Sequence, residues 1–350
     1  MINHNRPNLS AKSLEDLNLC LKSKDLSTNK FVKKFENLFS QKYYKSGFSV
    51  VVSSGTSALF LAIKALKIKK KKPRVLVPTY ACSAILNAIH LANCKPVITD
   101  IEKDTFTIES EIKYKNIDII IAVNIFGSNP NIKKIKKNYP QSKIILDACH
   151  STGMKINNRS DVFLSDIVIH SFYATKIITS GHGGLVWSKN NKYINFCKDF
   201  INFDLRKKYK SRFNFLITDF QVSLLFDQLK NIEKIRKYRN NIFQMYKNSI
   251  PDNIKIFSPY DLNVDIVYRS VLIFDKISKK IAFKKKLLKN NIETIVPVEN
   301  FELLHNYKKL NKKYFKVSED ISKITLSLPM HTSLKKNEVY KICKLLKKIK

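Results

Sequence analysis

Three short stretches of the chain hold the residues best suited to chemistry. The first is Ser54-Gly-Thr-Ser57, which leads into an apolar run with helical spacing. The second is Asp147, which ends an apolar, strand-like run, and the third is Lys176, which stands in a polar turn about thirty residues later. A helix that begins at a small polar turn offers backbone N–H groups and a positive dipole end to an anion.

Lys176 stands between two runs that read as strands. Residues 167–171 form a β-branched run that ends in Ser171, and Gly181-His-Gly-Gly184 forms a turn that leads back into apolar residues 185–187. A lysine fixed beside buried strands is expected to lose hydration, which lowers the pKa of its ammonium. The free amine would then be available for Schiff-base chemistry.

Together the three stretches suit pyridoxal phosphate. The helix N-terminus and Ser171 would hold the phosphate, Asp147 would keep the pyridine nitrogen protonated, and Lys176 would bind the aldehyde. Each stretch also has an ordinary interpretation, since Ser-Gly-Thr is a common helix cap. The chain has no Walker loop, G-x-S-x-G or H-E-x-x-H motif. Cys149 and His150 are expected to point apart at a strand end, so they do not predict a thiolate pair.

The elements between these stretches alternate between strand and helix. Strands are expected at 48–53, 74–77, 96–100, 117–123, 143–147 and 167–171, and helices at 58–66, 84–91 and 131–138. This alternation predicts an α/β fold with a mainly parallel sheet, whose ligands bind beyond the carboxyl ends of the strands. The residues at these ends are Thr56, Tyr80, Cys82, Asp147 and Ser171.

The flanking segments are expected to be more helical. Helices are predicted at 9–23, 30–42, 191–205, 219–249, 277–289 and 334–349, and short strands at 254–257, 267–274 and 292–295. We expect a large cofactor-binding domain over residues 1–240 and a smaller C-terminal α/β domain over 241–350. The N-terminal segment is expected to pack on the small domain.

The composition indicates which binding partners and which cellular compartment to expect. The 350 residues carry a formal net charge of +36, but the excess is lysine and runs the whole length of the chain. This favours a compositional bias on solvated positions, so neither nucleic acid nor a membrane is expected as a partner. The six scattered cysteines and the absence of a signal-like start favour a cytoplasmic protein without a metal site.

Several segments, in this order, resemble the DegT/DnrJ/EryC1/StrS family of pyridoxal-phosphate-dependent sugar aminotransferases. They are Val52-Ser-Ser-Gly-Thr-Ser-Ala-Leu59, Val75-Leu-Val-Pro-Thr-Tyr80, Lys95-Pro-Val-Ile-Thr-Asp-Ile101, Asp147-Ala-Cys-His150, Ser171-Phe-Tyr-Ala-Thr-Lys176, Gly181-His-Gly-Gly184, Phe213-Asn214, Thr218-Asp219 and Leu326-Ser-Leu-Pro-Met-His331. The resemblance covers nearly the whole chain and implies the aspartate aminotransferase fold, fold type I.

The resemblance also implies a role for individual residues. Lys176 would be the catalytic lysine, and Asp147 would pair with the pyridine nitrogen. His150 stands where the family usually has Gln, near the ring hydroxyl, and Cys82 or Tyr80 stands where an aromatic residue commonly stacks on the ring. The phosphate would be bound by Gly55, Thr56, Ser57 and Ser171, and by Asn214 from the neighbouring subunit of a homodimer. His182 and Leu216 depart from the family's usual Glu and Arg.

The implied reaction transfers an amino group, from L-glutamate, to a nucleotide-linked keto-sugar in amino-sugar biosynthesis. Two alternatives stay open at this point. One is a cofactor-dependent sugar dehydratase of the same family, although dehydratases replace the lysine with His and Lys176 is present. The other is a basic regulatory or nucleic-acid-binding protein on the same scaffold, which the presence of Lys176 and Asp147 disfavours.

Overall fold

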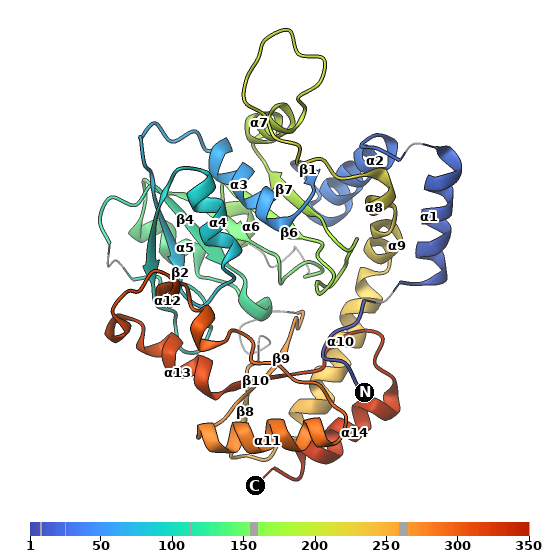
Figure 1. Cartoon of the computed structure of the whole chain (residues 1–350), viewed down its shortest axis with the longest axis vertical. Helices are drawn as coiled ribbons and strands as arrows, with labels where there is room; N and C mark the ends of the chain where they lie inside the picture. The colour runs from blue at the N-terminus through green and yellow to red at the C-terminus, as the bar shows by residue number, and fades with distance from the viewer. Residues whose placement is uncertain (8, 25, 112–113, 155–159, 259–264, 350) are drawn as a thin grey trace.

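A seven-stranded sheet forms the centre of the protein (Figure 1). The computed structural model describes residues 1–349 except 8, 25, 112–113, 155–159 and 259–264. The strand order is β1-β7-β6-β5-β4-β2-β3. The strands are β1 (Phe48–Val52), β2 (Arg74–Pro78), β3 (Lys95–Thr99), β4 (Ile119–Val123), β5 (Lys143–Asp147), β6 (Ile167–Ser171) and β7 (Gly184–Ser188). Strands β6, β5, β4, β2 and β3 pair in parallel, whereas β7 is antiparallel to both β1 and β6.

Helices cover both faces of this sheet. The side chains of β4 alternate between two apolar cores, with Ile119 and Ile121 in one and Ile120 and Ala122 in the other. A strand covered on both faces reads as one continuous apolar run, as this one does. The helices on the first face are α3 (Gly55–Ala65), α4 (Ala84–Leu91) and α7 (Asn191–Ile201). Those on the second include α2 (Lys30–Leu38), α5 (Ile132–Asn138), α6 (Ser160–Leu164), α8 (Asp219–Ser223) and α9 (Leu225–Lys230). The predicted α/β class with a mainly parallel sheet is confirmed.

A smaller antiparallel sheet lies in the lower part of the view in Figure 1. Its order is β10 (Thr325–Leu328), β9 (Ser270–Ile273) and β8 (Lys255–Ile256). A third apolar core joins it to α10 (Ile232–Lys247), α11 (Ile277–Lys289) and α14 (Lys336–Leu346), and includes Ile2. Ile2 also pairs with Ile292. The boundary at residue 240 stays a prediction, and α10 runs through it without a break.

The segment between α11 and β10 lies against the large sheet. It contains α12 (Leu304–Tyr307) and α13 (Lys316–Ile324). The buried His305 bonds through Nδ1 to Thr79 Oγ1 at 2.7 Å and through Nε2 to Glu319 at 3.0 Å. Asp100 accepts N–H bonds from Val317 and Ser318. These contacts hold the loops that follow β2 and β3 against the C-terminal third of the chain.

Some expected element boundaries are wrong. The helix predicted at 219–249 is three helices, α8, α9 and α10, with one break at Leu224 and a second at Asn231. The Asn231 side chain bonds back to the backbone carbonyl and the carboxylate of Asp227, in competition with helix hydrogen bonds. The predicted helix 30–42 ends at Leu38 and continues as a π-helix to Tyr44. The predicted helix 191–205 ends at Ile201, and the strand at 292–295 is reduced to isolated pairs.

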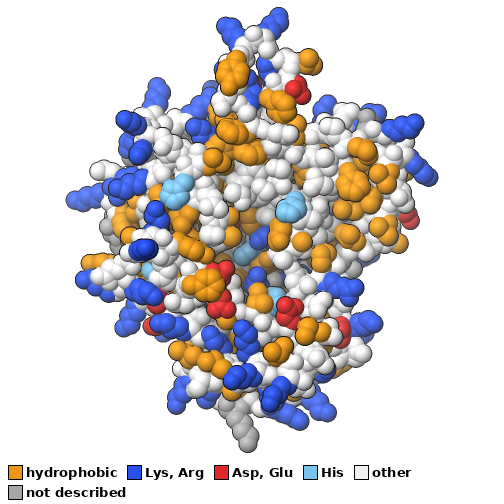
Figure 2. All heavy atoms as spheres, viewed as in Figure 1, with side chains coloured by type: hydrophobic (Ala, Val, Ile, Leu, Met, Phe, Trp, Pro, Cys, Tyr) orange, Lys and Arg blue, Asp and Glu red, His pale blue; other side chains and the backbone are white. Residues whose placement is uncertain are grey.

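Lysine and arginine side chains are spread over the whole face shown in Figure 2 and do not gather in one patch. Among the described helices, none has the length and apolar character needed to cross a membrane.

Candidate active site

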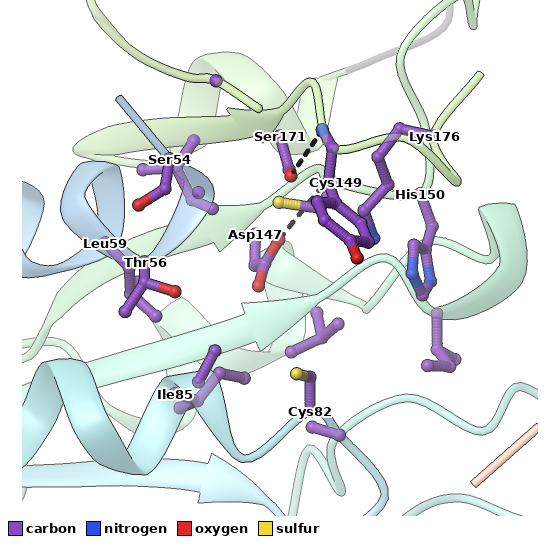
Figure 3. Close-up of a pocket in the computed structure, with 18 of the residues that line it drawn as sticks. Ser54, Thr56, Leu59, Cys82, Ile85, Asp147, Cys149, His150, Ser171 and Lys176 are labelled. Atoms are coloured by element: carbon purple, nitrogen blue, oxygen red, sulfur yellow. Dashed lines mark hydrogen bonds between the residues drawn. The ribbon is translucent and has the colours of Figure 1, made fainter. Parts of the chain in front are cut away.

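A cavity of about 440 Å³ opens at the carboxyl ends of the parallel strands (Figure 3). It brings together most of the residues singled out in the sequence, although these come from separate elements. The predicted residues that line it are Gly55, Thr56, Cys82, Asp147, His150, Ser171 and Lys176. Ser57 and Asn214 do not line it.

The N-terminus of α3 forms one end of the cavity. Ser54 is the N-cap residue, and its Oγ accepts the N–H of Ser57 at 3.0 Å. Gly55 has to be small, because a Cβ there would lie 2.9 Å from the Cβ of Ser171. A Cβ at Gly184 would lie 2.2 Å from the carbonyl oxygen of Ser54. The close packing of β6, β7 and α3 therefore places Ser171 beside a helix N-terminus, which is suited to an anion.

The Ser57 side chain turns away from the cavity. Its hydroxyl lies 2.7 Å from Ser54 Oγ and 3.0 Å from the Ser54 carbonyl, and its N–H is used by the helix cap. Ser54, which the sequence analysis did not select, lines the cavity instead. The sequence signal for Ser54 was its place as the serine directly before a glycine that opens a helix.

Asp147 lies at the end of β5 and is buried. Its Oδ1 accepts the N–H of Cys149 at 3.1 Å. Burial raises the pKa of Asp147 above its ordinary value, and hydrogen bonds from Cys149 and the charge of Lys176 offset this only in part. A buried carboxylate of this kind is stabilised by a cationic partner, such as a protonated pyridine nitrogen.

Lys176 lies in the turn after β6, and its N–H donates to the carbonyl of Tyr173 at 2.9 Å. Its Nζ is 5.3 Å from the centroid of the Tyr268 ring. Burial acts to lower the pKa of Lys176, but Tyr268, Cys149 and Asp147 together raise it above its ordinary value. The expectation of a lowered pKa is wrong, because acidic groups surround the amine.

His150 is stacked between two aromatic rings. Its ring centroid is 3.9 Å from that of Tyr268 and 6.0 Å from that of Phe126, with both pairs nearly parallel. Burial, together with the charges of Lys176 and Arg269, lowers the pKa of His150 well below its ordinary value. The Nδ1 atom accepts the N–H of Phe126 at 3.3 Å. The imidazole is therefore neutral, and Nε2 carries the proton as a donor.

The structure separates the two candidates for the ring-stacking position. Cys82 is exposed and lines the cavity. Tyr80 is fully buried and packs edge-on against Phe106 and Phe126, outside the cavity lining. A thiol therefore stands on the side of the cavity where the resemblance implies an aromatic ring.

Cys149 and His150 both line the cavity. They lie in a turn and not on a strand, because β5 ends at Asp147. Burial, reinforced by the charge of Asp147, raises the pKa of the Cys149 thiol well above its ordinary value. This shift opposes formation of a thiolate at Cys149, so burial adds a second reason against a thiolate pair.

Asn214 is exposed on the loop between α7 and α8, which protrudes at the top of Figure 1. Its Oδ1 accepts the N–H of Leu216 at 3.3 Å. The same loop exposes large apolar side chains, among them Leu205 and Tyr209, which are 103% and 95% exposed. The structure of one chain therefore does not bring Asn214 to its own cavity.

Residues that were not expected to bind the cofactor also contribute to the cavity or its wall. Tyr173 and His182 line it and pack edge to face, with ring centroids 5.2 Å apart. Tyr268 reaches the site from the segment before β9, far along the chain. No local motif marks Tyr268, and only the packing of the smaller sheet against the larger one shows it.

Comparison with known proteins places this geometry in a family. The model of the DegT/DnrJ/EryC1/StrS aminotransferase family matches residues 7–347. The chain is 26% identical to GDP-perosamine synthase of Escherichia coli O157:H7, over 97% of this chain and 95% of that protein. It also shares the fold of PseC of Helicobacter pylori, an aminotransferase involved in the biosynthesis of pseudoaminic acid. That comparison gives a TM-score of 0.88 at 20% identity, covering 98% of this chain and 97% of the other.

A solved sugar aminotransferase structure from Streptococcus pneumoniae, in its PMP form, has a TM-score of 0.90 at 19% identity. The match covers 99% of this chain and 98% of the other chain. These likenesses confirm fold type I. The chain belongs to the DegT/DnrJ/EryC1/StrS aminotransferase family and is a pyridoxal-phosphate-dependent aminotransferase.

Proposed function

We propose that this aminotransferase transfers an amino group from L-glutamate to the ketone of a nucleotide-linked sugar, in amino-sugar biosynthesis. The observation that carries the proposal is that Lys176, Asp147 and the N-terminus of α3 line one cavity. The names of relatives support the substrate class, since GDP-perosamine synthase and PseC both belong to amino-sugar biosynthesis.

The residues present fit pyridoxal phosphate. The N-terminus of α3 and Ser171 would hold its phosphate, and Asp147 would pair with its pyridine nitrogen. This pairing would add a second positive partner to the buried Asp147 carboxylate, which the charge of Lys176 stabilises only in part. His150 Nε2 would donate to the ring hydroxyl, and Cys82 would contact the ring in place of an aromatic residue. When bound, the cofactor carries the amino group between the two substrates and accepts the electron pair released at the donor's Cα.

The protein's own groups position and move protons. Lys176 Nζ would take the proton from the donor's Cα once the donor has displaced it from the cofactor. It would hold that proton near Asp147 and Tyr268, which together favour its ammonium form. In the second half of the reaction the same Nζ would deliver a proton to the sugar carbon that receives the amino group.

The protein is proposed to act as a homodimer in the cytoplasm. The exposed loop that carries Asn214 and its apolar side chains would reach the phosphate in the neighbouring subunit. The six cysteines are free, as is expected in a reducing compartment.

The test is the visible absorbance of the purified protein after addition of pyridoxal phosphate. We expect wild type to show the absorbance of a covalently attached cofactor and to lose it when L-glutamate is added. Lys176→Ala should lose the covalent attachment, whereas Lys64→Ala, a matched change at an exposed position on α3, should behave as wild type. A wild type without this absorbance would contradict the proposal.

A second experiment identifies the acceptor. The glutamate-treated enzyme is mixed with nucleotide-linked keto-sugars, and recovery of the absorbance is followed together with formation of the amino-sugar. Recovery with 2-oxoglutarate but with none of the sugars tested would mean that the proposed acceptor class is wrong.

A further inference from the structure

Tyr268 contacts two parts of the active site from a distant part of the chain. Its ring stacks on the imidazole of His150, with centroids 3.9 Å apart and an angle of 10° between the planes. Its hydroxyl donates to the carbonyl of Thr175 at 3.3 Å, and Lys176 Nζ lies 5.3 Å from the ring centroid. Tyr268 is buried and does not line the cavity, so we expect it to act on a bound molecule through these neighbours.

The backbone of Tyr268 is fixed on both sides. Its N–H donates to the carbonyl of Phe126 at 3.2 Å, and its own carbonyl accepts a hydrogen bond from Arg239 Nη2. At Gly127 a Cβ would lie 2.6 Å from the carbonyl oxygen of Ile266, so the turn after β4 packs directly on the segment that carries Tyr268. A side chain held by backbone contacts of this kind can keep its neighbours in one orientation.

The imidazole of His150 depends on this ring for its closer stacking contact. Phe126 also stacks on His150, but its centroid is 6.0 Å away, and its N–H donates to His150 Nδ1 at 3.3 Å. That hydrogen bond makes Nε2 the donor of the neutral imidazole. Without the Tyr268 ring, His150 would keep only the longer of its two stacked contacts.

We propose that Tyr268 is a positioning residue for two groups at once. Its ring holds the imidazole of His150 where Nε2 can donate to the cofactor's ring hydroxyl, and its hydroxyl fixes the turn that brings Lys176 to the cavity. The first of these contacts rests on the role proposed for His150. Because Tyr268 lies just before β9, the segment that leads into the small sheet sets the geometry of the cofactor site on the large one.

The first test measures the affinity of the cofactor-free protein for pyridoxamine phosphate. This probe keeps the ring hydroxyl but lacks the aldehyde, so it binds without attachment to Lys176. Tyr268→Leu should bind it about 3- to 10-fold more weakly, because a stacked contact on His150 is lost. Tyr268→Phe keeps the ring and should bind it as wild type does. In a His150→Ala background, Tyr268→Leu should cause no further loss, because the residue through which it acts is absent.

Tyr246 provides the matched control. It is buried in the core of the small sheet, outside the cavity lining, and its hydroxyl donates to the carbonyl of Pro329 at 3.1 Å. Tyr246→Leu should lower stability in urea unfolding but leave the affinity for pyridoxamine phosphate unchanged. An equal loss of affinity on Tyr268→Leu with and without His150 would overturn the inference, because it would give Tyr268 a general structural role. A His150→Ala variant with wild-type affinity would overturn it as well.

The second test follows the rate at which added pyridoxal phosphate becomes attached to Lys176, measured by absorbance. Tyr268→Phe loses the bond to Thr175 and should attach the cofactor about 3- to 10-fold more slowly, the range set by loss of one hydrogen bond. Tyr246→Phe should attach it at the wild-type rate. An unchanged rate in Tyr268→Phe would overturn the inference, and this test decides alone if Tyr268→Leu does not fold. Neither test uses an amino donor or a sugar, so their outcome is separate from that of the proposed transfer.

Discussion

The residues around Lys176 favour its ammonium form. Tyr268, Cys149 and Asp147 raise its pKa although the amine is buried. Asp147 would also pair with the pyridine nitrogen of the bound cofactor. The carboxylate that helps to hold the lysine proton is thus the one that the cofactor's nitrogen would engage.

At the residue scale, Asp147→Asn tests the role of that carboxylate. An amide cannot keep the pyridine nitrogen protonated, so the rate of bleaching by L-glutamate is expected to fall by about 100-fold or more. The cofactor should still attach, because Lys176 is intact. Measurement of the bleaching rate beside the bound-cofactor absorbance separates the two effects. Asp166→Asn, at a carboxylate that pairs with Lys143 before β6, is the control. Equal bleaching rates in wild type and Asp147→Asn would contradict the assignment.

The sequence indicated several residues that line one cavity, but it did not indicate their environment. Lys176, Asp147 and Ser171 were recognisable because each follows a strand-like run whose carboxyl end faces the ligand side of a parallel sheet. The direction of the Lys176 pKa shift depends on Tyr268, which local spacing does not connect to the lysine. The turn after β5 was also not predicted, so Cys149 and His150 were expected to lie at a strand end.

At the element scale, the contact between β7 and α3 shapes the phosphate end of the cavity. Gly184 begins β7 and lies so close to the Ser54 carbonyl and the Gly55 nitrogen that no side chain fits between them. A side chain at position 184 would displace backbone atoms at the N-terminus of α3. Backbone atoms cannot rotate away as a side chain can.

We therefore expect Gly184→Ala to weaken pyridoxal phosphate binding and to destabilise the fold by about 1–3 kcal/mol, as overpacking does. Gly181→Ala is the control in the same turn, because its Cβ would meet no atom within 4 Å. Because Gly181 has a positive φ of 79°, Gly181→Ala is also strained, by about 1 kcal/mol. Both variants therefore lose stability, and they are compared by their affinity for the cofactor. Equal cofactor affinity in both variants would mean that the close packing does not shape the site.

At this scale the sequence did not predict where some helices end or which strand pairings would be short. Periodicity placed the strands of the large sheet because each is a compact apolar run between turns. It did not show that the Asn231 side chain would end a helix, because its apolar stripe continues through that position. Nor did it show that residues 292–295 would form only single pairs with Ile2 and Ser327.

At the scale of the whole molecule, the N-terminus stabilises the small sheet through His4. The His4 Nε2 is 2.9 Å from Ser327 Oγ, and burial, with the charges of Arg269, His331 and Arg239, lowers its pKa to about 3. Since the unfolded pKa is 6.5, the unfolded chain binds the proton more tightly. The stability contributed by neutral His4 is complete above pH 6.5 and is lost as the pH falls toward 3.

Urea unfolding of wild type and His4→Gln at pH 7, 6 and 5 measures this effect. Below pH 6.5 we expect the free energy of unfolding of wild type to fall by up to about 1.4 kcal/mol per pH unit because of His4 alone. In His4→Gln this contribution to the fall should be absent. His90→Gln is a control, because His90 is exposed on α4. Parallel pH slopes for wild type and His4→Gln would show that His4 does not carry the acid sensitivity.

The proposed sharing of the site between subunits is tested by mixing two inactive chains. Lys176→Ala lacks the reacting amine, and Asn214→Asp places a negative charge where the partner's phosphate would lie. If equal amounts are unfolded and refolded together, half of the dimers are mixed and each contains one intact site, so about a quarter of wild-type activity is expected. Each variant refolded alone is the control. Activity no higher than the average of these controls would mean that Asn214 does not act across the interface.

The protruding loop between α7 and α8 has a consequence for enzyme dosage. The loop carries Asn214, the asparagine assigned to a neighbour, and this residue does not line the cavity of its own chain. A lone chain would then be incomplete, so turnover per molecule would fall on dilution as dimers separate. Halving expression would lower flux through the pathway by more than half once the concentration approaches the dissociation constant.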